Sequence, residues 1–173
     1  MPVSTIDSHV RAALQLRADR DTMYVAIGQT SDWQDEENPP TEDETTSTLN
    51  EVIGYKKVST CVLCRPLGDG ETTSYATFDM PDGTWVEIPD SDAYTEQARH
   101  IFIESEILSS DLPLGEYRQV GVHVDLTANS GINKNNLEPS EVSDEGVLLF
   151  YENKLSQRRI ENTTVKEGFI VEV

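Results

Sequence analysis

A succession of short β-prone runs, bounded by Gly, Pro, Asn or Asp, is the feature that most restricts how this chain can fold. Runs of this length and composition are typical of strands, and the turn residues between them favour antiparallel connections. No alternation of strands and long helices indicates a parallel sheet, and no internal repeat is present. We expect strands at 23–27, 58–63, 72–79, 85–88, 99–107, 117–126, 147–153 and 163–173.

One helical pattern precedes these strands. Apolar side chains such as Ile6 and Val10 recur at helical spacing over residues 4–19, and Ser4 is a suitable helix N-cap. A further helical turn or two is expected at 48–55. The sequence therefore predicts an α+β fold that is mainly antiparallel β with an N-terminal helix, in a sandwich-like or mixed β domain.

The charge balance restricts the partners of the chain. Its 173 residues suit a single β-rich structural domain, 1–173, and carry 32 acidic against 13 basic side chains, a net charge of −19. Such a surface repels phosphate backbones and anionic lipids, so nucleic acid and membrane are not expected partners. The charge either keeps the chain soluble or prevents premature assembly. Neither a secretory signal nor a membrane-spanning run is recognisable, so we expect synthesis in a cytoplasm.

An acidic, proline-bearing loop is predicted at about 30–46. Residues 32–46 include seven acids and no base, and this composition cannot pack into a core. Trp33 is the one large apolar side chain of the loop. It either folds back onto its own domain, which we expect, or inserts into a neighbouring protein.

Two cysteines and three histidines are the candidates for chemistry. Cys61 and Cys64 form a CxxC pair, but residues three apart in a strand point to opposite faces, so we expect one buried and one exposed thiol. No second ligand pair completes a zinc site. His9 lies in the expected helix, and His100 and His123 lie in expected strands, where a histidine bonded to a neighbour such as Asp125 is the common outcome.

Other catalytic and binding motifs are absent from the sequence. Asp90-Ser-Asp92 begins like a calcium loop but lacks its glycine and closing glutamate, and Gly68-Asp-Gly70 is not followed by the lysine of a phosphate-binding loop. No nucleophile elbow is found. We therefore expect no catalytic residues, no metal and no cofactor, and a protein that is not an enzyme.

Two segments resemble one known family. Residues 24–40, YVAIGQTSDWQDEENPP, are similar to a segment near the N-terminus of baseplate wedge subunits of contractile-tailed bacteriophages. Residues 146–159, GVLLFYENKLSQRR, lead into the last strand and resemble the C-terminal hairpin of that family. The resemblance covers about a third of the chain. It implies a β-rich, enzymatically inert virion protein of the tail baseplate, made in the host cytoplasm.

The resemblance also implies partners. Such subunits pack with other baseplate or tail proteins, as homo- or hetero-oligomers in a six-fold assembly. Tryptophan and arginine are favoured interface anchors, so the expected interface residues are Trp33, Pro39, Pro40, Arg158 and Arg159. The basic cluster near Arg158 contrasts with the acidic loop, either as complementary patches or as solvated faces. The last strand belongs to the chain's own sheet, which we expect, or adds to the sheet of a neighbour.

A different class of function remains open at this point. A carbohydrate- or host-surface-binding β domain of a phage tail would use Trp33 and Trp85 to stack on sugar rings. Such binding would persist in the isolated protein.

Overall fold

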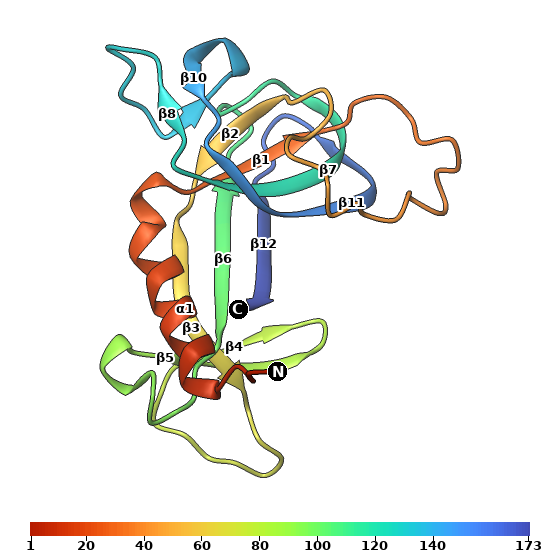
Figure 1. The fold of residues 1–173 in the computed structure, drawn as a ribbon. Helices are drawn as coiled ribbons and strands as arrows, with labels where there is room; N and C mark the ends of the chain where they lie inside the picture. Colours follow the sequence, from red (N-terminus) through yellow and green to blue (C-terminus); the bar gives the residue numbers. More distant parts are fainter. The chain divides into compact units, whose positions relative to one another are not determined.

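The computed structural model describes all 173 residues. One α-helix at the N-terminus is followed by antiparallel β-sheets (Figure 1), which confirms the predicted fold class. The chain forms two compact units. The first comprises Met1–Arg20, Thr60–Ile103 and Gly168–Val173, and the second comprises Asp21–Ser59 and Glu104–Glu167. Whether the two units unfold together, as expected for a single domain, stays a prediction.

Helix α1 (Ile6–Ala18) belongs to the first unit. Its N-cap is Thr5, one residue after the predicted cap, and the hydroxyl oxygen of Thr5 accepts the Ser8 N–H at 3.2 Å. Val10 and Ala13 are fully buried and attach the helix to the core of the unit. The other buried members of this cluster are Leu63, Val86, Ile88, Ala93 and Ala98.

The strands of the first unit belong to a five-stranded sheet with the order β12-β6-β3-β5-β4. The Pro81-Asp-Gly83 sequence closes the predicted tight hairpin between β4 and β5, with Gly83 at a φ of 141°. Two strands, β6 and β12, have residues in both units, and β12 lies in the chain's own sheet. The strands are β3 (Thr60–Pro66), β4 (Thr77–Met80), β5 (Gly83–Ile88), β6 (His100–Ile107) and β12 (Val165–Glu172).

The second unit holds the other five-stranded sheet, in the order β11-β7-β1-β2-β9, and a small sheet of β10 and β8. Its core cluster includes Tyr24, Leu49, Tyr55 and Leu137. The strands are β1 (Tyr24–Gly28), β2 (Gly54–Lys57), β7 (Gly115–Val124), β8 (Thr127–Ala128), β9 (Asn136–Leu137), β10 (Val142–Asp144) and β11 (Val147–Arg159), and the short 3-10 helices of the chain are η1 (Asp19–Thr22), η2 (Asp90–Asp92) and η3 (Pro139–Glu141).

The helical segment predicted at 48–55 is wrong. These residues lead instead into β2, which pairs with both β1 and β9. Gly54 explains part of this outcome, because a Cβ at this position would lie 2.5 Å from a methyl group of Leu112 and 2.8 Å from the carbonyl oxygen of Leu137. Glycine is favoured here because other segments of the same chain approach its backbone closely. The local pattern of apolar residues does not reveal that approach.

Candidate functional site

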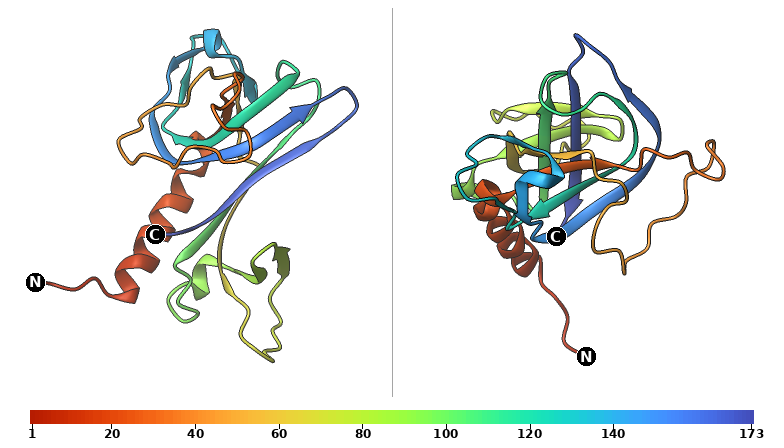
Figure 2. Two further views of the ribbon diagram at one scale, coloured as in Figure 1. Left: turned by 90° about the vertical axis from the view of Figure 1, so that its right-hand side faces the viewer. Right: turned by 90° about the horizontal axis from the view of Figure 1, so that it is seen from above.

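Strand β11 is the outer strand of its sheet and pairs only with β7. In Figure 2 the blue ribbon of β11 runs alongside the teal ribbon of β7. Strand β11 continues to Arg159, six residues past the predicted end at Asn153, so Lys154, Arg158 and Arg159 lie on the strand. A β-bulge interrupts its register, since Asn153 pairs with Gln119 whereas Gln157 pairs with Tyr117. An outer strand presents unpaired N–H and C=O groups that can pair with another chain.

The long loop between β1 and β2 covers part of this edge, and we call residues 30–46 the acidic loop. The Trp33 indole N–H donates to the carbonyl oxygen of Lys154 at 2.9 Å. The Asn153 N–H donates to a carboxylate oxygen of Glu42 at 2.8 Å, and the side-chain amide of Asn153 donates to the Pro40 carbonyl. The loop therefore satisfies edge groups of β11 at the bulge without adding a strand.

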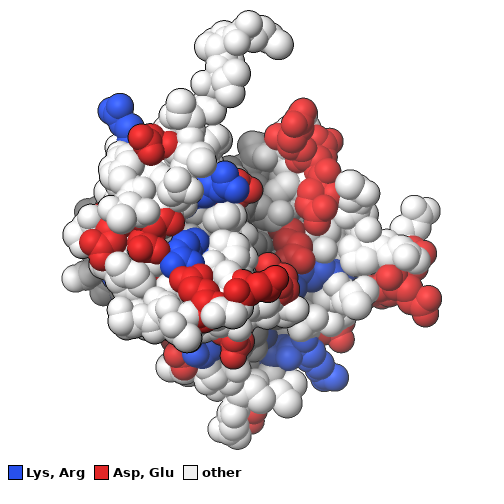
Figure 3. Space-filling model, turned by 90° about the horizontal axis from the view of Figure 1, so that it is seen from below, with Lys and Arg blue, Asp and Glu red and all other residues white.

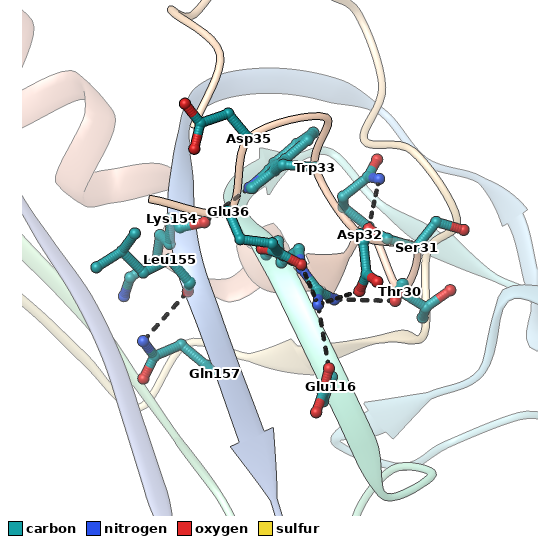
Figure 4. A network of polar contacts seen from close by, with 12 residues as sticks. Thr30, Ser31, Asp32, Trp33, Asp35, Glu36, Glu116, Lys154, Leu155 and Gln157 are labelled. Atoms are coloured by element: carbon teal, nitrogen blue, oxygen red, sulfur yellow. Dashed lines mark hydrogen bonds and ion pairs between the residues drawn. The ribbon is translucent and has the colours of Figure 1, made fainter. Parts of the chain in front are cut away.

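Arg118 fixes the start of the acidic loop (Figure 4). Its guanidinium, on β7, donates to the carbonyl oxygen of Thr30 at 2.9 Å, to Asp32 at 2.6 Å and to Glu36 at 2.8 Å. Glu116 adds a fourth acceptor at 3.1 Å. The Arg118 side chain is only 2% exposed, and a buried cation is tolerated only when it is paired and hydrogen-bonded.

This cluster shifts the pKa values of its members. Hydrogen bonds from Arg118 hold the pKa of Glu36 below its usual range, and the bond to Glu36 is the main reason that the pKa of Arg118 is raised. Within the loop, hydrogen bonds from Thr45 lower the pKa of Asp43, and the Asn38 side chain does the same for Asp35. Carboxylates of the acidic loop therefore take part in the contacts that define its conformation.

Sequence reasoning did not identify Arg118. The available signal was a basic residue inside the β-prone run 117–126, in a chain whose acidic loop supplies several carboxylates without a cation of its own.

The predicted interface residues differ in how exposed they are. Trp33 is half-buried and folds back onto its own chain as expected, Pro39 is half-buried, and Pro40 and Arg158 are exposed.

Arg159 lies inside the second unit and is 2% exposed. Its guanidinium donates to the backbone carbonyl oxygens of Leu108, Leu112 and Pro113, and burial lowers its pKa. In this structure it therefore stabilises the connection between β6 and β7.

Both cysteines are buried, so the expectation of one exposed thiol is wrong. Their side chains lie on opposite faces of β3, as predicted, but both faces are covered. Cys64 packs with Trp85 and Phe102, and Cys61 is 1% exposed. Burial raises the pKa of Cys61 to about 11 and that of Cys64 to about 12, so neither forms a thiolate near neutral pH.

The three histidines contact backbone carbonyl groups or aromatic rings of the chain. His123 is fully buried, and its Nδ1 lies 3.0 Å from the carbonyl oxygen of Glu145 rather than near Asp125. The Nδ1 atom of His9 contacts the carbonyl oxygen of Val173, and the His100 ring packs edge-on against Trp85. No group of three or more His, Cys, Asp or Glu side chains is arranged to hold a metal ion, and no helix is long and apolar enough to cross a bilayer.

The surface is predominantly acidic. Asp and Glu side chains spread over the face seen in Figure 3, with Lys and Arg between them. Most of the cations form ion pairs with carboxylates of the same chain. Because acidic side chains outnumber basic ones by 32 to 13, many carboxylates remain without an ion-pair partner. Besides Arg118, the paired cations are Arg17, Lys56, Arg65, Arg99, Lys134, Lys154 and Lys166.

Comparison with known proteins decides the family. Residues 1–173 match the family described as "Baseplate wedge 3 tail fiber network component". The chain belongs to this family. It is also 43% identical over 171 residues to "Virion protein 3" of Enterococcus phage phiEF24C, which covers 99% of this chain and 94% of that protein. The resemblance to baseplate wedge proteins is thus confirmed, and the chain is a structural protein of a phage virion and tail.

Proposed function

We propose that this baseplate wedge protein is a non-catalytic connector in a contractile tail, which holds neighbouring baseplate and tail-fibre proteins through protein–protein interfaces. Membership of a family described as a component of the tail fiber network supports this role. The single observation that carries the choice of surface is the Arg118 cluster. It holds an acidic loop in a fixed shape before any partner binds, which lowers the entropic cost of binding.

The acidic loop presents several groups to a partner. Glu37 and Glu44 are exposed, and their carboxylates are not used to fix the loop. Pro40, between them in the sequence, is also exposed, and Trp33 is half-buried against β11. We propose that a neighbouring wedge or fibre protein with a basic surface binds here, within an assembly of six-fold symmetry.

Sugar binding is less well supported than assembly. Trp85 is 7% exposed and packs in a core cluster, so its ring faces are not available for stacking. The indole N–H of Trp33 is engaged by the backbone of β11. Proposed binding through the acidic loop therefore rests on charge and shape rather than on aromatic stacking.

The test is complementation of a phage that lacks this gene. Glu37→Lys combined with Glu44→Lys reverses two exposed charges without touching the Arg118 cluster. We expect particles that lack fibre proteins, seen by quantitative mass spectrometry and negative-stain microscopy. The control is Glu106→Lys, an exposed acid on β6. Wild-type copy number in a multiple of six would support the assembly, and absence of the chain from purified tails would refute the proposal.

A further inference from the structure

One end of the β7–β11 ladder is an exposed surface that combines apolar and charged side chains. Arg158 pairs in register with Glu116, and Arg159 pairs with Gly115 at the end of the ladder. Arg158 and Glu116 are both exposed. Because directly opposed residues of an antiparallel pair project to the same face, their side chains share one face of the sheet.

Two apolar side chains adjoin this pair. Leu114 directly precedes β7 and is 43% exposed, and Ile160 directly follows β11 and is 50% exposed. Both would be desolvated by any protein that covered the end of the ladder. We call Leu114, Glu116, Arg158 and Ile160 the ladder-end patch.

Arg158 is one of several cations of this chain that form no ion pair. Most of the others, such as Arg118 and Lys154, are held by carboxylates, and Arg158 is the unpaired cation that lies on the ladder-end patch. The carboxylate directly opposite, on Glu116, is turned to Arg118 at 3.1 Å. Arg158 is therefore available to a carboxylate of another molecule.

We infer that the ladder-end patch is a two-fold contact between two copies of this chain. A two-fold axis that runs parallel to the strands, midway between β7 and β11, exchanges the two strands of the facing copy. Arg158 of each copy then meets Glu116 of the other, and the apolar ends face one another. Such a contact is isologous, because one patch is complementary to itself.

This inference names one partner for the proposed function and rests on it. The patch is small beside the ~800 Å² per partner of a stable interface, and two acidic chains repel each other. The free chain therefore associates weakly. In a baseplate, neighbouring contacts raise the effective concentration of the two copies to about the millimolar range, which completes the pairing.

The test is sedimentation velocity of the purified full chain over a concentration series, at about 0.15 M salt, where distant charges are screened. We expect a monomer–dimer equilibrium in the wild type, and an association constant at least about tenfold lower for Arg158→Glu. Arg11→Glu is the matched control, because it makes the same change in net charge on an exposed part of α1. A wild-type chain that is monomeric up to about 1 mM would overturn the inference.

Mixing two variants tests the predicted geometry directly. Arg158→Glu and Glu116→Lys each place like charges across the two-fold axis, so each alone remains monomeric. Glu116→Lys also removes one acceptor of Arg118, so hydrogen exchange of its acidic loop is compared with that of the wild type before mixing. Their equimolar mixture restores both opposite-charge pairs, and we expect heterodimers with about the wild-type association constant. A mixture that stays monomeric while the wild type dimerises would overturn the assigned contact.

The apolar half of the patch has its own variant. Ile160→Asp should lower association about tenfold, whereas Ile132→Asp, at an exposed residue elsewhere in the second unit, should not. Equal losses for the two variants would overturn the inference. The proposed function is tested separately, because fibre proteins retained in particles depend on the acidic loop. Failure of dimerisation with normal complementation would leave that function intact.

Discussion

Arg118 and Glu36 are joined by an ion pair of 2.6 Å, although 82 residues separate them in the sequence. One lies on a buried strand and the other on an acidic surface loop. The pair therefore couples the order of the loop to the folding of the sheet. This coupling gives the loop a defined shape wherever the sheet is folded.

Replacement of Arg118 by methionine should release the acidic loop. The carboxylates left behind are partly solvated, so we expect a loss of roughly 1–3 kcal/mol in the free energy of unfolding rather than global collapse. Urea unfolding measures that loss, and hydrogen exchange should show faster exchange in the loop. Arg158→Met is the matched control, since Arg158 is exposed and forms no ion pair. An unchanged exchange rate in the loop would contradict the anchoring role.

The acidic loop should also detach at low pH. The pKa values of Glu36 and Asp43 are depressed in the folded chain, so their stabilising contribution is complete above their unfolded values, near pH 4, and is lost as the pH falls through the lower folded values. Trp33 reports this release by its fluorescence. A Trp85→Phe background removes the second tryptophan of the chain.

As the pH is lowered, we expect Trp33 fluorescence to change at a higher pH than the far-ultraviolet circular dichroism, because the sheet stays folded after the loop detaches. Glu36→Gln should shift or abolish the early transition, since the neutral amide makes a weaker bond with Arg118. Coincident transitions in both signals would mean that the loop and the sheet titrate as one unit.

The sequence predicted those features that depend on local pattern. The helix, most strands, the Pro81-Gly83 hairpin and the acidic loop follow from periodicity and turn chemistry, and Trp33 folds back as expected. The pairing of Arg118 with the loop could not be predicted, because it depends on which segments the fold brings together. The burial of both Cys61 and Cys64 was not predicted for a related reason, since the residues that cover each face of β3 are distant in the sequence.

Gly54 provides a test of the strand that the sequence missed. A Cβ at this position would meet a methyl group of Leu112 and the carbonyl oxygen of Leu137 within 3 Å. Gly54→Ala should therefore destabilise the chain by roughly 1–3 kcal/mol in urea unfolding, as overpacking does in other cores. Alanine would stabilise the helical turn first predicted here, so a gain in stability would contradict the strand assignment.

The two cysteines should report unfolding rather than redox chemistry. Cys61 and Cys64 are buried, with thiol pKa values of about 11 and about 12, so a thiol reagent at pH 8 finds neither access nor thiolate in the folded chain. We expect modification to be slow in buffer and rapid in denaturing urea. The rate in buffer should rise with destabilising variants such as Gly54→Ala, because reaction proceeds through opening of the fold. Rapid modification of one thiol in the native wild type would show that one face of β3 is open to solvent.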